Sequence, residues 1–122
     1  MAAVIAGYSR SPFTPANKGA LAKTRPDDIA AAVVDRLLED TDIEPSLVED
    51  LLVGCAFPEA EQGYNLARII TFLTKLPETV PGVTINRFCG SSMQAIHEAA
   101  AKVNSGQGDV FIAGGVESMS RI

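Results

Sequence analysis

The sequence has few of the residues on which several classes of protein depend. Only two of its 122 residues are cysteines, Cys55 and Cys89, which is too few for a disulfide scaffold. Reduced thiols in a cytoplasmic setting are the simpler expectation. The two cysteines also lack Cys-x-x-Cys spacing, so the sequence predicts neither a redox pair nor a bound metal.

Positive charge and long apolar runs are also scarce. Ten Lys and Arg residues face fifteen Asp and Glu residues, and the net charge of −5 argues against electrostatic binding to nucleic acid or to an anionic membrane. No apolar window approaches the length of a membrane span. The apolar stretch at the N-terminus is too short for a signal peptide and follows no basic residue. We therefore expect a soluble cytoplasmic protein.

What is present fits one globular α/β domain. Hydrophobic residues make up 47% of the chain and charged residues 20%, which argues against disorder. Short apolar runs predict strands at 2–8, 51–57, 83–88 and 109–113, the last ended by a Gly-Gly pair. Helical spacing predicts helices from about 24 to 40, at 65–75 and at 91–104, with Thr24 as the first N-cap and Gly106 as the last C-terminal cap. This alternation indicates a layered fold with a largely parallel sheet.

Cys89 lies in the predicted turn between the strand at 83–88 and the helix that starts at Ser91. The unpaired N–H groups of a first helical turn, together with the helix dipole, favour a thiolate at such a position. The same N–H groups can hold a developing oxyanion, and Gly90 leaves room for a close approach of substrate. The alternative is a small buried thiol with no chemical role. The residues alone leave both interpretations open.

Other residues that attract attention have structural explanations. His97 follows Cys89 by eight residues on one helix, about 12 Å along its axis, whereas a hydrogen bond reaches about 3 Å. We therefore expect His97 on a helix face and Cys55 as a buried structural thiol. The glycines at 106–108 and 114–115 fail the context of a dinucleotide loop, because no helix starts at either place.

Four segments resemble motifs of the thiolase family. Residues 86–96, NRFCGSSMQAI, resemble the nucleophile segment of these enzymes. Residues 62–68, QGYNLAR, resemble the family's Gly-Gln-Asn-Pro-Ala-Arg region, with one residue inserted and leucine in place of proline. Residues 106–110 and 113–120 resemble the strand and loop after the nucleophile helix, and residues 10–13 resemble the end of the first strand. The resemblance covers the whole chain in order.

Thiolases are acyl-CoA C-acyltransferases, and the resemblance implies a fold and a site. The fold would be a thiolase-like layered α/β/α half with a mostly parallel mixed sheet. Residues 1–122 would be the N-terminal part of the family's N-terminal domain, so we expect a fragment of a longer protein. Cys89 would be the nucleophile that carries the acyl-thioester intermediate, with backbone N–H support from Cys89 and Gly90. The family's Gly-His-Pro histidine and Cys-x-Gly cysteine do not occur in these 122 residues, so the isolated chain should not turn over.

The resemblance also implies a reaction and partners. The enzyme would be a 3-ketoacyl-CoA or acetoacetyl-CoA thiolase of fatty-acid metabolism and beta-oxidation, with coenzyme A as a substrate, no permanently bound cofactor and no metal. A homo-oligomer, dimer or tetramer, would be its assembly, and Arg68 would have a structural or interface role. Two alternatives stay open: a ketoacyl synthase of the same superfamily, and a catalytically silent domain that binds acyl-CoA or a partner. The net charge and the residues that follow Cys89 favour the thiolase.

Overall fold

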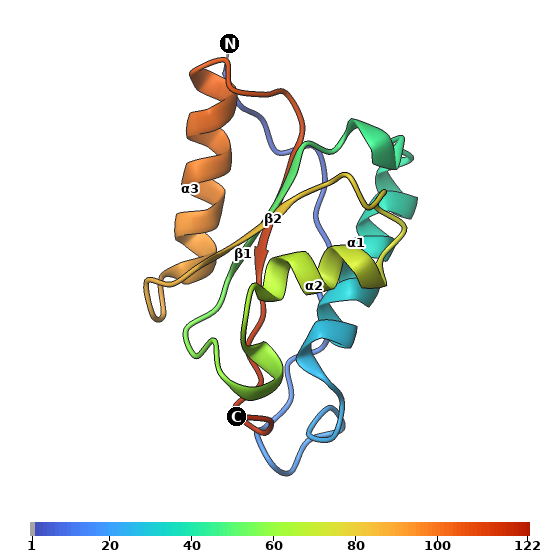
Figure 1. Ribbon diagram of the computed structural model, residues 1–122. Coiled ribbons are helices and arrows are strands. Elements are labelled where there is room, and N and C mark those ends of the chain that lie inside the picture. The colour runs from blue at the N-terminus through green and yellow to red at the C-terminus, as the bar shows by residue number, and fades with distance from the viewer. Residues whose placement is uncertain (1) are drawn as a thin grey trace.

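A three-stranded parallel sheet forms the centre of the computed structural model, which describes residues 2–122 (Figure 1). The strands β1 (Asp50–Gly54), β2 (Gly82–Ile85) and β3 (Phe111–Gly115) lie in the order β2-β1-β3. In the register, Leu52 of the central strand lies opposite Val83 and Ala113. The crossovers from β1 to β2 and from β2 to β3 each contain a helix, as connections between parallel strands of one sheet require.

The helices cover both faces of the sheet. The helices α1 (Pro26–Thr41) and α2 (Leu66–Leu73) lie on one face, and α3 (Ser91–Asn104) lies on the other (Figure 1). Two short 3₁₀ turns, Pro45–Leu47 and Ala60–Gln62, precede and follow β1. The layered α/β prediction is therefore confirmed, and every strand pair in the described part of the chain is parallel. In residues 2–122 no helix is long and apolar enough to cross a membrane.

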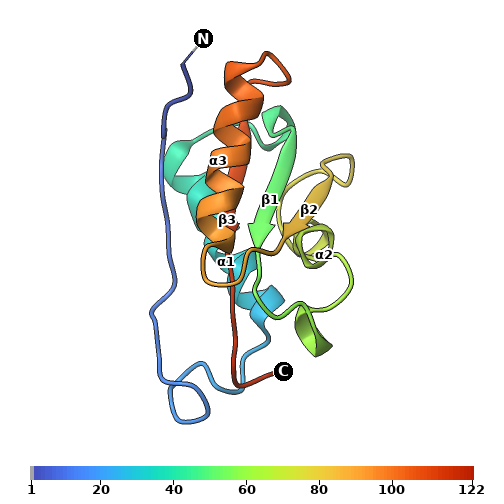
Figure 2. The same ribbon diagram turned by 90° about the vertical axis from the view of Figure 1, so that its left-hand side faces the viewer.

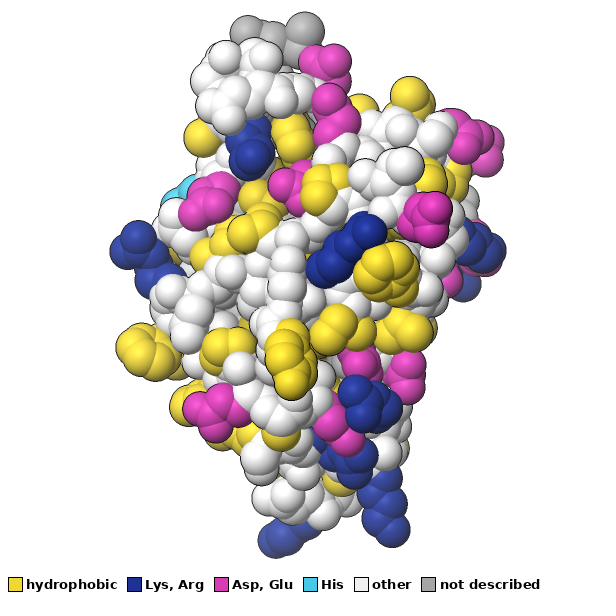
Figure 3. All heavy atoms as spheres, in the orientation of Figure 1, with side chains coloured by type: hydrophobic (Ala, Val, Ile, Leu, Met, Phe, Trp, Pro, Cys, Tyr) yellow, Lys and Arg dark blue, Asp and Glu magenta, His cyan; other side chains and the backbone are white. Residues whose placement is uncertain are grey.

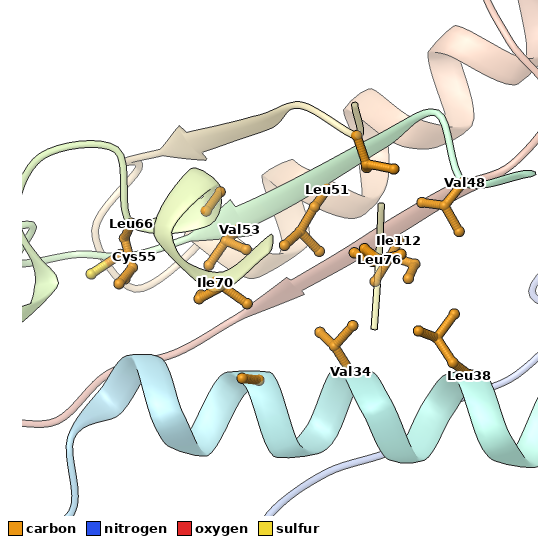
Figure 4. Close-up of a cluster of buried hydrophobic side chains, with 13 residues drawn as sticks. Val34, Leu38, Val48, Leu51, Val53, Cys55, Leu66, Ile70, Leu76 and Ile112 are labelled. Atoms are coloured by element: carbon orange, nitrogen blue, oxygen red, sulfur yellow. The ribbon is translucent and has the colours of Figure 1, made fainter. Parts of the chain in front are cut away.

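The main hydrophobic core lies between the sheet and the α1 and α2 layer. Leu51 and Val53 of β1 point toward Val34 of α1 and Ile70 of α2 (Figure 4). These four residues are at most 7% exposed. The sequence of β1 is continuously apolar because a central parallel strand is buried on both of its faces. Burial of each such side chain contributes about 1.5–3 kcal/mol to the free energy of unfolding.

The helix predictions hold at α1 and α3 except at one cap. Arg25, and not Thr24, is the N-cap of α1, and Pro26 occupies the first helical position. Thr24 instead donates its N–H to the Leu21 carbonyl in the preceding turn, at 3.0 Å. At the C-terminal end of α3, Gly106 has a φ of 77°. The glycine cap predicted there is confirmed.

The strand predictions need more correction. Residues 2–8 form no strand, because no neighbouring strand in the described part of the chain pairs with their backbone. This extended segment runs past α3 (Figure 2), and Val4, Ile5 and Tyr8 are more than 80% exposed. β1 ends at Gly54 and β2 at Ile85, earlier than predicted. The N–H groups of Ala56 and Phe57 donate to the Glu117 side chain and not to a neighbouring strand, and the chain turns at Phe88, where φ is 46°. β3 runs from Phe111 to Gly115 and not from 109 to 113, so the Gly114-Gly115 pair forms its last two residues instead of following it.

Candidate active site

The turn between β2 and α3 presents Cys89 to solvent. Residues 86–90 connect Ile85, the last residue of β2, to Ser91, the first residue of α3. Cys89 is exposed, whereas the other thiol, Cys55, is buried. The predicted placement of Cys89 directly before a helix is confirmed. A buried thiol without access to a substrate, which was the alternative interpretation, is excluded for Cys89.

Side chains before and after Cys89 hold this turn together. The Phe88 N–H donates to Asn86 Oδ1 at 2.9 Å, and the Asn86 amide donates to the Ala56 carbonyl at 3.2 Å. On the helix side, the buried hydroxyl of Ser91 accepts the Arg87 N–H at 2.8 Å and donates to the Phe88 carbonyl at 2.6 Å. The backbone of residues 87 and 88 is thus fixed by two flanking side chains.

Two glycines of the sheet allow the start of α3 to lie directly on it. Gly54 and Gly115 are register partners at the ends of β1 and β3. A Cβ on Gly54 would overlap the backbone of Ser91 and Ser92, and a Cβ on Gly115 would lie 2.7 Å from the Ser92 Cβ. Close helix-to-sheet contact therefore sets the position of the turn that carries Cys89. An isolated glycine in an apolar run, as at Gly54, is the sequence signal for such an approach, and our sequence analysis did not use it.

A carboxylate after β3 joins the loops at this edge of the sheet. Glu117 accepts the N–H groups of Ala56 at 2.7 Å and of Phe57 at 3.0 Å, and the side-chain amide of Gln62 at 2.9 Å. Gln62 is fully buried, and its Oε1 accepts the N–H of Ser118. The Gly-Gly-Val-Glu-Ser-Met segment therefore has a structural role, because its Glu117 connects the end of β3 to the loop after β1. Neither Gln62 nor Glu117 was assigned a role from the sequence.

A hollow of about 1400 Å³ adjoins Cys89. Its wall includes Phe88, Cys89, the end of β3 and the extended N-terminal residues. Single-ligand pockets usually measure about 300–1000 Å³, so the hollow is larger than one small ligand would fill.

Comparison with known proteins decides the family. Residues 3–122 match the family described as "Thiolase, N-terminal domain". The chain belongs to the thiolase N-terminal domain family. It is 48% identical over 120 residues to a 3-ketoacyl-CoA thiolase of Bacillus subtilis (strain 168), which is 98% of this chain and 31% of that protein. It is 46% identical over 119 residues to a 3-ketoacyl-CoA thiolase of Psychrobacter cryohalolentis, 98% of this chain and 30% of that protein.

A solved structure agrees with this thiolase assignment. The crystal structure of the Bacillus anthracis acetyl-CoA acetyltransferase superposes with a TM-score of 0.89 at 36% identity, over 96% of this chain and 29% of that one. The chain therefore spans about three tenths of the length of these relatives.

The two thiols of this thiolase domain differ in more than exposure. Burial, followed by the charge of Glu117 and its hydrogen bond to the thiol, raises the pKa of Cys55 to about 12. The Cys55 Sγ lies 3.5 Å from Glu117 Oε2. A thiol with this pKa is protonated at neutral pH. The buried position predicted for Cys55 is confirmed.

The backbone of the turn that carries Cys89 bears on the oxyanion support predicted from Cys89 and Gly90. The N–H of Gly90 donates to the Arg87 carbonyl at 3.0 Å, and the N–H of Ser91 donates to the Phe88 carbonyl at 3.1 Å. In this conformation Gly90 is therefore engaged within the turn and does not present a free donor. The support expected from the Cys89 N–H stays a prediction.

His97 and Arg68 lie on helices and outside the turn that carries Cys89. His97 is exposed on α3, two turns beyond Cys89, as predicted for a helix-face residue. Arg68 donates to the Val80 carbonyl at 2.5 Å, and its guanidinium carbon lies 4.1 Å from the centroid of the Phe72 ring. The hydrogen bond joins α2 to the segment before β2, and the Phe72 ring packs against the guanidinium on α2 itself. Both contacts support a structural role for Arg68.

Proposed function

We propose that this chain carries the nucleophile of a thiolase-type acyl-CoA C-acyltransferase, with Cys89 as the residue that is acylated. The observation that carries the proposal is an exposed thiol at the start of α3, in a chain of the thiolase N-terminal domain family. The turn that carries this thiol is held by hydrogen bonds with Asn86 and Ser91. The relatives are 3-ketoacyl-CoA thiolases and an acetyl-CoA acetyltransferase, which supports acyl-CoA as the substrate class.

The proposed reaction proceeds through a covalent intermediate. The Cys89 thiolate attacks the keto carbon of a 3-ketoacyl-CoA, and the bond between that carbon and the α-carbon breaks. The α-carbon leaves with the bonding electron pair, takes up a proton and departs as acetyl-CoA. The thiolate of free coenzyme A then attacks the acyl-cysteine, which releases the shortened acyl-CoA and regenerates Cys89. The proposal includes coenzyme A as a substrate, a place in fatty-acid breakdown and a cytoplasmic location.

This chain supplies only part of the chemistry. The reaction needs a base to activate the thiol and an acid to protonate the α-carbon. The single histidine, His97, is two helical turns from Cys89, and Cys55 is buried and neutral. We therefore propose that the isolated chain becomes acylated on Cys89 without sustained turnover.

We also propose that the protein self-associates through the β2 edge of the sheet. β2 is an edge strand in the described structure, with Val83 37% exposed. Phe72 and Leu73 of α2 are 60% and 46% exposed. Hydrophobic side chains reach the surface on the face that carries α2 (Figure 3). An exposed edge strand beside an apolar helix face favours pairing with a second copy.

Mass spectrometry of the intact chain tests the acylation proposal. The purified chain is incubated with acetyl-CoA or with acetoacetyl-CoA and coenzyme A, and adducts are located by peptide mapping. We expect an acyl adduct on Cys89 in the wild-type chain and in Cys55→Ala, and none in Cys89→Ala. An unmodified wild-type chain, or an adduct that persists in Cys89→Ala, would refute the assignment. A chain that binds acyl-CoA without an adduct would instead be a silent binding domain.

A further inference from the structure

Phe88, the residue before the nucleophile, has a backbone conformation that L-residues rarely adopt. Its φ is 46°, in the left-handed region that favours glycine. Its side chain is 69% exposed, so packing within the described part of the chain does not hold it there. A conformation of this kind persists only where surrounding groups enforce it, and such residues cluster at functional sites.

Asn86 supplies the enforcing contacts on the strand side. Its Oδ1 accepts the Phe88 N–H at 2.9 Å, and its Nδ2 donates to the Ala56 carbonyl at 3.2 Å. One side chain therefore connects the turn to the loop after β1, which is thirty residues away in the sequence. A side chain that bonded only its own turn would not connect the turn to the loop after β1.

The loop that receives Asn86 is itself held in place. The Ala56 N–H donates to Glu117 Oε1 at 2.7 Å, while the Ala56 carbonyl accepts Asn86. Hydrogen bonds thus run from Glu117 after β3, through Ala56 after β1, to Asn86 and Phe88 before α3. The position of the turn is coupled to the ends of both neighbouring strands.

We propose that Asn86 is the positioning residue of the nucleophile: its amide joins Ala56 to Phe88 and so fixes the left-handed turn that presents Cys89 at the start of α3. The inference rests on the proposed function only where acylation is the readout. The geometric part concerns the turn alone and is tested separately.

The geometric test is amide hydrogen exchange at Phe88 in the full chain. Asn86→Ala should accelerate exchange of the Phe88 N–H about fivefold, the factor that corresponds to one neutral hydrogen bond. Asn86→Asp keeps an oxygen that accepts this N–H and should retain the protection. The matched control is Asn104→Ala, which deletes an asparagine that accepts the Ala3 N–H at the far end of α3. Unchanged exchange in Asn86→Ala, or equal acceleration in the control, would overturn the proposal.

The chemical test is rescue of acylation by glycine. Asn86→Ala should slow acylation of Cys89 by acetyl-CoA, while native labelling of buried Cys55, which reports opening of the core, stays at the wild-type rate. Adding Phe88→Gly should restore much of the acylation rate, because glycine adopts a positive φ without enforcement. A general loss of stability would raise Cys55 labelling and would not be corrected by glycine at one position.

The outcomes separate the two proposals. A wild-type chain that is never acylated would refute the proposed function, and the exchange experiment would still decide the role of Asn86. Acylation at the wild-type rate in Asn86→Ala, or no rescue by Phe88→Gly, would overturn the positioning role. Should Asn86→Ala fail to fold, Asn86→Asp tests the bridge instead, because it keeps the acceptor of the Phe88 N–H and loses the amide that donates to Ala56. Acylation at the wild-type rate in Asn86→Asp would then overturn the positioning role.

Discussion

Gly54 lies in direct contact with the first turn of α3, which makes Gly54→Ala a direct test of how Cys89 is positioned. A Cβ at this position would overlap the backbone carbonyl of Ser91 and the backbone nitrogen of Ser92. Backbone atoms cannot rotate away as a flexible side chain can, so the first turn of α3 would have to shift. The substitution should therefore disturb Cys89 as well as stability.

The magnitude follows from overpacking in a tight contact. Inserting one methyl group into a filled space costs about 1–3 kcal/mol in the free energy of unfolding, and contact with backbone on the opposing side places Gly54→Ala at the upper end. The neighbouring glycine of β3, Gly114, is a matched control, because nothing lies within 4 Å of its added Cβ. Gly114→Ala should be neutral, or stabilising by about 0.4–1 kcal/mol through the lower entropy of the unfolded chain.

Denaturant unfolding of the two variants and the wild type gives the free energies. Alkylation of Cys89 by iodoacetamide in the native state reports on the turn. We expect Gly54→Ala to lose stability and to change the Cys89 rate, and Gly114→Ala to change neither by much. Equal stabilities for the two variants would refute the reasoning, because the contact of Gly54 with α3 is the feature that separates them.

Further predictions follow from the two thiols, Glu117 and the β2 edge. Cys89 should react with iodoacetamide far faster than Cys55 in the native chain, because a thiol with a pKa of about 12 has about 10⁻⁴ of its population as thiolate at pH 8; equal native rates in peptide mapping would contradict this. The pKa of Cys55 is raised in the folded state above its unfolded value of about 8.5. The contribution of the protonated thiol to stability should therefore be complete below about pH 8.5 and be lost as the pH rises toward 12. Alkaline unfolding that is equally steep in Cys55→Ala would contradict this prediction. Glu117→Gln should cost about 1–3 kcal/mol, because one amide oxygen replaces a carboxylate that accepts several donors; an unchanged denaturation midpoint would show that these bonds contribute little. Sedimentation should show self-association that is weakened by Val83→Lys on the edge strand; a wild-type monomer at high concentration would refute the β2 interface.

Much of the helical structure could be predicted because its signals are local. The 3.6-residue spacing of apolar side chains located α1 to within about two residues, and Ser91–Asn104 agrees with α3 at both ends. The cap at Gly106 is likewise a local property, since a positive φ favours glycine there. The prediction for residues 2–8 is wrong because a strand exists only where a neighbour accepts its hydrogen bonds, and the chain segment itself does not carry that information.

The family, the central apolar strand and the place of Cys89 directly before a helix could all be predicted from the residues alone. These properties reside in contiguous residues, whose periodicity and glycines act within a few positions along the chain. The way in which Cys89 is held could not be predicted, because it depends on contacts between distant parts of the chain. The contacts that hold it join Asn86 to Ala56 and Ala56 to Glu117, thirty and sixty-one residues apart, and Gly54 to the first turn of α3. Such pairings depend on which strand ends become neighbours in the folded sheet, so no local pattern in the sequence specifies them.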